Sequence, residues 1–130
     1  MAETKHVERP LSPHIQIYRP MLLPIVSILV RITGHGVFIA SFLVAWWLLA
    51  AAMSDAHFAV ANAVMTSWFG DLVMTLALLG MWYHYFAGLR HLTFDAGRGL
   101  DVKTAETLGI VALVGSVVMT VITLLILMIV

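Results

Sequence analysis

Three long apolar stretches, separated by polar segments, dominate the pattern of this 130-residue sequence. They cover residues 21–53, about 63–92, and 108–130. About 20 apolar residues are enough for a helix to cross the hydrocarbon core of a bilayer. The pattern therefore predicts an all-α membrane protein with three transmembrane helices, at about 22–53, 63–92 and 106–130.

The segments between these stretches are polar. Residues 1–20 contain three prolines, so we expect an extended or irregular N-terminal segment outside the bilayer. Residues 54–62 are expected to form a short loop, and residues 93–107 a polar connector. Residues 21–130 then form a single membrane domain.

The basic residues have a one-sided distribution. With three spans, every lysine and arginine falls in or beside the N-terminal segment and the second connector: Lys5, Arg9, Arg19, Arg31, Arg90, Arg98 and Lys103. The first loop and the C-terminus carry none. The positive-inside rule therefore predicts a cytoplasmic N-terminus and a C-terminus outside the cytoplasm.

Composition agrees with the membrane assignment and excludes several chemistries. Hydrophobic residues make up 62% of the chain and charged residues 11%, whereas a soluble domain carries about 25% charged residues. The absence of cysteine excludes a thiolate-held iron–sulfur cluster or a thioether-attached haem within this chain. The N-terminus lacks the apolar core of a cleavable signal peptide. We expect a multi-pass protein of the bacterial inner membrane that contacts lipid and binds no nucleic acid.

The second stretch carries an imidazole, His84, at membrane depth. Gly80 and Gly88 lie one helical turn before and after it, so the three residues share one face. This row predicts a bare strip of backbone that gives a flat macrocycle clearance to approach the ring. Haem iron commonly takes axial histidine, and ionisable residues inside membrane helices mark functional sites. The row favours His84 as a b-type haem ligand, while a hydrogen-bonded structural histidine is the simpler alternative.

A second row of polar residues lies on the first predicted helix. Ser27, Arg31 and His35 follow one another at intervals of four, which places them on one face. Ser27 and Arg31 are expected at one depth with Arg90 and His91 of the second helix, and His35 and His84 somewhat deeper. Such donors suit the propionates of a haem and the carbonyls of a quinone. Alternatively, the two arginines anchor their helices at the membrane surface by snorkelling.

The third stretch has no charged residue, and we expect it to be scaffold. It carries small residues suited to close helix contact: Gly109, Gly115, Ser116, Thr120 and Thr123. Asp71, near the far end of the second stretch, is expected to turn outward or to bond to a neighbouring chain.

These motifs resemble the cytochrome b subunit of succinate dehydrogenase, the larger of the two small membrane anchors of respiratory complex II. The resemblance covers nearly the whole chain. It rests on Arg9-Pro10, on the run Ser27-Ile-Leu-Val-Arg31-Ile-Thr-Gly34, and on His84-x-x-x-Gly88-Leu-Arg90-His91-Leu-x-Phe94-Asp95-x-Gly97.

The resemblance implies a function and a set of site residues. His84 would be one axial ligand of a single haem b, and a companion anchor subunit would supply the other. Ser27 and Arg31 would contact ubiquinone, the substrate, while Arg31 and His91 would lie near the haem propionates. No residue of this chain would be catalytic by itself. The partner chains would be the companion anchor, a flavoprotein subunit and an iron–sulfur subunit, and the two anchors would form a hetero-oligomeric helical bundle. The complex would link the tricarboxylic acid cycle to aerobic electron transport.

One position departs from the family pattern. The family usually has histidine or asparagine immediately before the motif arginine, where this chain has Val30. His35, one turn beyond Arg31, is a candidate to replace the missing propionate contact. Two alternative functions remain at this point: an anchor of a quinol:fumarate reductase, and a haem-free structural or proton-pathway subunit.

Overall fold

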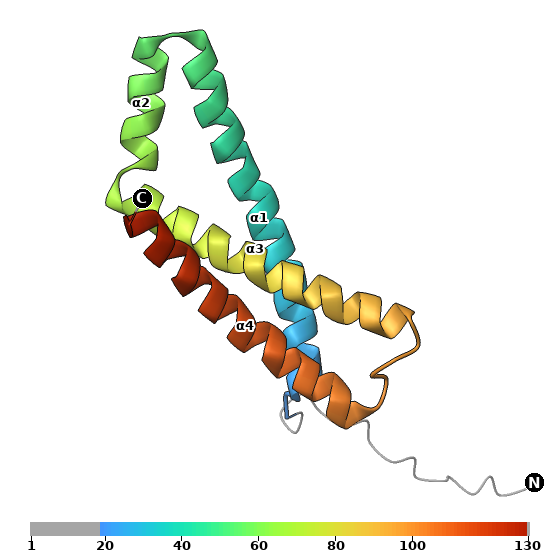
Figure 1. Ribbon diagram of the computed structural model, residues 1–130. Helices are drawn as coiled ribbons and strands as arrows, with labels where there is room; N and C mark the ends of the chain where they lie inside the picture. Colours follow the sequence, from blue (N-terminus) through green and yellow to red (C-terminus); the bar gives the residue numbers. More distant parts are fainter. Residues whose placement is uncertain (1–18, 130) are drawn as a thin grey trace, which may run out of the picture.

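The computed structural model describes residues 19–129, and its regular structure there is helical (Figure 1). The helices are α1 (Leu22–Met53), α2 (Asp55–Met65), α3 (Trp68–Asp95) and α4 (Val102–Ile129). Helices α1, α3 and α4 are long and apolar enough to cross a membrane. The prediction of an all-α protein with three transmembrane helices is confirmed. Nearly all of the predicted N-terminal segment, residues 1–18, lies outside the described part of the chain.

The predicted loop at residues 54–62 is wrong, because helix α2 occupies this segment. The Ser54 hydroxyl accepts a hydrogen bond from the backbone N–H of His57, which caps the helix start. A second serine, Ser67, caps α3 by accepting from the backbone N–H of Gly70 at 3.1 Å. The predicted second helix, 63–92, is therefore interrupted. Its first three residues belong to the end of α2, and residues 68–92 belong to α3, which begins at Trp68.

Helix α4 begins earlier than the expected position 106. The Asp101 carboxylate accepts a hydrogen bond of 2.8 Å from the backbone N–H of Thr104. This carboxylate satisfies one of the free donors of the first turn, so the helix can begin at Val102, among polar residues.

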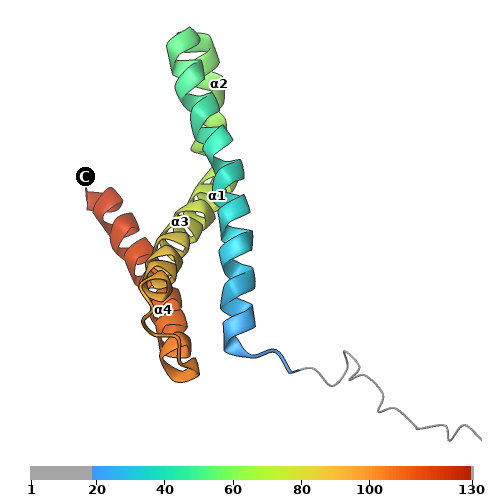
Figure 2. The same ribbon diagram turned by 90° about the vertical axis from the view of Figure 1, so that its right-hand side faces the viewer.

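Helix α3 is the central element and contacts both α1 and α4. Figure 2 shows α1 and α4 diverging from the end of the molecule where α1 begins and α3 connects to α4. At that end the two helices touch, with Val26 of α1 packed on Gly109 of α4. The basic residues Arg19, Arg31, Arg90, Arg98 and Lys103 belong to the segments at this end (Figure 1).

The small residues of α4 make close helix contacts, as the sequence predicts, and several of them lie toward α3. A Cβ atom added to Gly115 would lie 3.2 Å from Cε2 of Phe86, so the ring lies directly on the glycine. Ser116 and Thr120 are buried. The hydroxyl of Thr123 accepts a hydrogen bond of 3.1 Å from the indole N–H of Trp82. Close approach and one interhelical hydrogen bond thus join α3 to α4.

Candidate functional site

His84 lies where α3 crosses α1, and its side chain is exposed. A Cβ atom built on Gly34 of α1 would lie 3.1 Å from Cε1 of His84 and 3.4 Å from Nδ1. Nε2 lies more than 4 Å from that point. The Nδ1–Cε1 edge of the ring therefore faces Gly34 of α1, and Nε2 is the nitrogen farther from that glycine.

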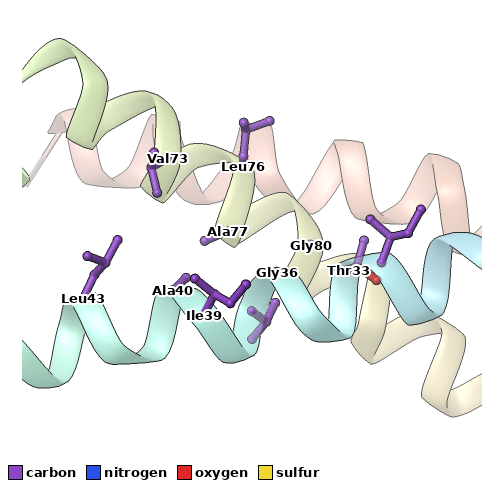
Figure 3. Close-up of a pocket in the computed structure, with 11 residues that line it drawn as sticks. Thr33, Gly36, Ile39, Ala40, Leu43, Val73, Leu76, Ala77 and Gly80 are labelled. Carbon is purple, nitrogen blue, oxygen red and sulfur yellow. The ribbon is translucent and has the colours of Figure 1, made fainter.

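The two glycines beside His84 have different surroundings, which corrects half of the predicted bare strip. Gly80 is buried, and a Cβ atom there would lie 3.5 Å from Cγ2 of Val37 and 3.6 Å from Cβ of Thr33. Gly80 thus belongs to the α1–α3 contact, where Figure 3 shows it close to α1. A Cβ atom on Gly88 would have no atom within 4 Å. The backbone beside His84 is open on the Gly88 side.

Two apolar grooves flank the α1–α3 crossing. Figure 3 shows the first, a groove of about 310 Å³ with Leu43 of α1 and Val73 of α3 in its walls. The second, of about 440 Å³, has Ser41 of α1 and Met81 of α3 in its walls. Met81 precedes His84 by three residues, so both lie on the same side of α3. The imidazole therefore adjoins apolar space deeper along the helices.

The Ser27, Arg31 and His35 row lies on α1 as predicted. Ser27 is half-buried, and Arg31 and His35 are exposed. Gly34, which touches His84, follows Arg31 by three residues and Ser27 by seven, so it shares their face. The crossing therefore brings His84 to the side of α1 that carries Ser27 and Arg31.

His35 has one ring nitrogen engaged within its own helix. Nδ1 lies 2.7 Å from the backbone carbonyl oxygen of Arg31. Because a carbonyl oxygen only accepts, Nδ1 carries the hydrogen, and Nε2 of the neutral ring is an acceptor. His35 can therefore donate to a carboxylate through Nε2 only in its cationic form.

Arg90 is buried, unlike the exposed Arg31 and His91 of the predicted cluster. Its side chain is only 8% exposed, and its guanidinium carbon lies 4.7 Å from the centroid of the Phe94 ring. Within the described chain Nε of Arg90 has no hydrogen-bond partner. Arg90 is six residues beyond His84, or about 120° around the helix. The guanidinium therefore lies in the helix packing, held over an aromatic face.

His91 lies on the same side of α3 as His84, because seven residues are close to two turns. Its side chain is exposed, and its ring packs edge-to-face with Phe94 at a centroid distance of 6.2 Å. His84 and His91, with the half-buried Gly88 between them, share this side of α3 and are here called the histidine strip. Within residues 19–129, no three His, Asp or Glu side chains gather to hold a metal ion.

Tyr83 is a buried residue that sequence reasoning did not single out. Its hydroxyl donates a hydrogen bond of 2.8 Å to the backbone carbonyl of Val26. Tyr83 immediately precedes His84, and Val26 immediately precedes Ser27. A buried tyrosine hydroxyl usually finds a partner, but the sequence does not indicate that the partner is on α1. This bond joins the turn that carries Ser27 to the turn that carries His84.

Comparison with known proteins shows the family to which the chain belongs. A family model described as "Succinate dehydrogenase/Fumarate reductase transmembrane subunit" matches residues 5–123. The chain is 45% identical to the succinate dehydrogenase cytochrome b556 subunit of Paracoccus denitrificans, over 97% of both chains. It is 34% identical to the b556 subunit of Rickettsia conorii, over 93% of this chain and 97% of the relative. It is 35% identical to the cytochrome b560 subunit of Marchantia polymorpha, over 82% of both.

The matches span almost the whole chain, including α1, α3 and most of α4. With three apolar helices and bacterial relatives such as that of Paracoccus, the chain is a multi-pass protein of the inner membrane. It belongs to the family of succinate dehydrogenase/fumarate reductase transmembrane subunits, as a cytochrome b membrane anchor that is one subunit of an oxidoreductase and not a complete enzyme.

Proposed function

We propose that this chain anchors a succinate:ubiquinone oxidoreductase, supplies His84 as one axial ligand of a single haem b, and forms part of the ubiquinone-reduction site with Ser27 and Arg31. The observation that carries the proposal is the placement of His84. His84 belongs to α3, and its exposed imidazole lies against the face of α1 that bears Ser27 and Arg31. Exposing a polar ring at this depth is costly unless something outside the chain covers it.

The surroundings of His84 fit a flat macrocycle. Gly88 leaves open space one turn along the helix. The second groove, with Met81 in its wall, provides apolar surroundings on the same side. Nε2, the nitrogen farther from Gly34, is available as a ligand. Arg31 and His91 would hold the propionates, and His35 would do so when cationic. A bound haem b would supply a one-electron store beside the quinone site.

Ser27 and Arg31 suit the polar head of a quinone. The serine hydroxyl can donate to a carbonyl oxygen, and the guanidinium can stabilise the negative charge that develops there on reduction. Reduction also takes two protons. Arg31 keeps its own proton, so protons would arrive through water, the Ser27 hydroxyl or groups on partner chains.

We propose that partner chains complete both the haem site at the histidine strip and the quinone pocket at Ser27 and Arg31. A companion anchor would pack against the strip in a helical bundle and donate the second axial ligand. An iron–sulfur subunit and a flavoprotein subunit would cover the basic end. The gathering of arginines and Lys103 at that end supports a cytoplasmic N-terminus.

The family description covers succinate dehydrogenases and fumarate reductases, whereas the relatives compared above are named succinate dehydrogenase subunits. We therefore propose succinate oxidation as the working direction. Rates measured both ways in the purified complex, with ubiquinone and with a low-potential quinol, separate the two: faster fumarate reduction would contradict the proposal.

Ser27→Ala in the complete complex tests the quinone assignment. Loss of one donor to a buried group costs about 1–3 kcal/mol, so we expect kcat/KM for ubiquinone to fall at least about fivefold. Succinate oxidation by a water-soluble dye should not change, because the dye takes electrons before the quinone. Ser41→Ala is the matched control, an exposed serine of the same helix. Equal quinone kinetics in the Ser27 and Ser41 variants would refute the assignment.

A further inference from the structure

We infer that Gly34 of α1 is a positioning residue for the haem: its missing side chain sets the place and tilt of the His84 ring. The inference rests on the proposed role of His84 as an axial ligand. It assigns a function to a residue on the opposite helix that would touch neither iron nor quinone.

A side chain at position 34 would lie unusually close to the His84 ring. A Cβ atom there would lie 3.1 Å from Cε1 of His84, which is tighter than nine in ten real Cβ contacts. A methyl group at this position would therefore displace the ring by a few tenths of an ångström. Gly34 lets α1 support the Nδ1–Cε1 edge directly, and Nε2, farther from Gly34, is the nitrogen that remains for a ligand.

The cost of a displacement depends on whether the ring is held. A free imidazole on the protein exterior can turn about its side-chain torsions and relieve a contact of this size. A ring bonded to a metal through Nε2 cannot, because the bond fixes its distance and direction. A methyl at position 34 should therefore alter the metal bond much more than it alters the fold.

The chain provides two matched controls for this effect. Gly36 is in the same helix, but two residues correspond to about 200°, and a Cβ atom there would meet nothing within 4 Å. Gly80 is at the same crossing, where a Cβ atom would make ordinary contacts of 3.5 Å and 3.6 Å with α1. Alanine at either position adds the same methyl group without touching His84.

The test compares Gly34→Ala, Gly36→Ala, Gly80→Ala and His84→Ala in the detergent-purified complete complex. The readouts are haem content, the g values of the oxidised low-spin haem and its midpoint potential. We expect Gly34→Ala to shift both the g values and the midpoint, and both control glycine variants to match wild type. Unshifted values in Gly34→Ala would overturn the inference. Wild-type haem in His84→Ala would instead overturn the proposed ligand, so the two failures are distinguishable.

A second measurement covers the case in which Gly34→Ala fails to assemble. In His84→Gly complexes supplied with free imidazole, the ligand is no longer tied to α3 and can settle away from position 34. Adding Gly34→Ala to this background should leave haem content unchanged. An equal loss of assembly in both backgrounds would show a role in helix packing alone and would overturn the inference.

Discussion

The two sides of α3 differ in how completely this chain covers them. The side toward α4 is closed: Phe86 lies on Gly115, and Trp82 bonds to Thr123. The histidine strip on the other side is open, with His84 and His91 exposed. Both sides carry polar side chains, but the Trp82 indole bonds to another helix of this chain whereas the His84 and His91 rings are exposed. Under the proposed function, this difference separates scaffold from site: the closed side is packed by this chain, and the open side would receive the haem and the companion anchor.

The sharpest way to test this contrast is to add the same bulk to each side. Gly115→Leu would push on Phe86, so we expect a loss of about 1–3 kcal/mol in stability from overpacking. In Gly88→Leu the new Cβ would meet nothing within 4 Å among residues 19–129, so the helix packing should stay intact while haem binding falls. Detergent-denaturation midpoints and haem content of the purified complex measure both effects. Equal stability losses would contradict the contrast.

Tyr83 of α3 is bonded through its hydroxyl to α1, and its substitution should have a smaller effect on stability. Tyr83→Phe removes one buried hydroxyl and its bond to the Val26 carbonyl, at a cost of about 0.5–1.5 kcal/mol. The Val26 carbonyl still has a partner within its own helix. We expect a lower denaturation midpoint together with weaker quinone binding, because the Ser27 turn loses its tie to α3. A stability loss with unchanged ubiquinone KM would limit Tyr83 to packing.

The Trp82–Thr123 bond tests the closed side alone. Interhelical hydrogen bonds in membranes average about 0.6 kcal/mol, so Thr123→Val should produce a loss of that order. The haem spectrum and the quinone kinetics should match wild type. A changed midpoint potential in this variant would show that the closed side also shapes the site.

The smallest effect is expected at Asp101, outside the membrane spans. Hydrogen bonds from the Thr104 side chain and backbone hold the pKa of Asp101 below its ordinary value. The charged cap should therefore stabilise the start of α4 above about pH 4, and this contribution should be lost as the pH falls through the lowered pKa. Hydrogen exchange at the Thr104 amide, measured between pH 5 and 3, should show this loss in wild type. Asp101→Asn keeps a capping oxygen but does not titrate, so a pH dependence identical to wild type would contradict the assignment.

The sequence predicts the membrane helices well because their signal is local. Length and apolarity alone identify α1, α3 and α4, and the small residues of α4 indicate close packing. The polar start of α2 favours a loop by composition, but Ser54 and Asp55 are also favourable residues for a helix start, and the structure has the helix.

The site is less predictable, because it depends on how two helices cross. Spacing places Ser27 and Arg31 on one face and His84 near His91. Spacing does not indicate that Gly80 packs on α1 while Gly88 stays open, or that Gly34 supports the His84 ring. Nor does it separate Arg90 from His91, adjacent residues of which one is buried and one exposed. Those outcomes depend on the crossing angle and on contacts from α4.

The most direct test of the account is a reduced-minus-oxidised optical spectrum of the purified complex, with wild type beside His84→Ala. His35→Ala and His91→Ala serve as comparisons from the neighbouring positions. We predict a b-type haem signal in wild type that is lost or altered in His84→Ala, with smaller changes in the other two variants. A normal haem spectrum in His84→Ala, or no haem in wild type, would contradict the central claim that the open side of α3 is a haem site.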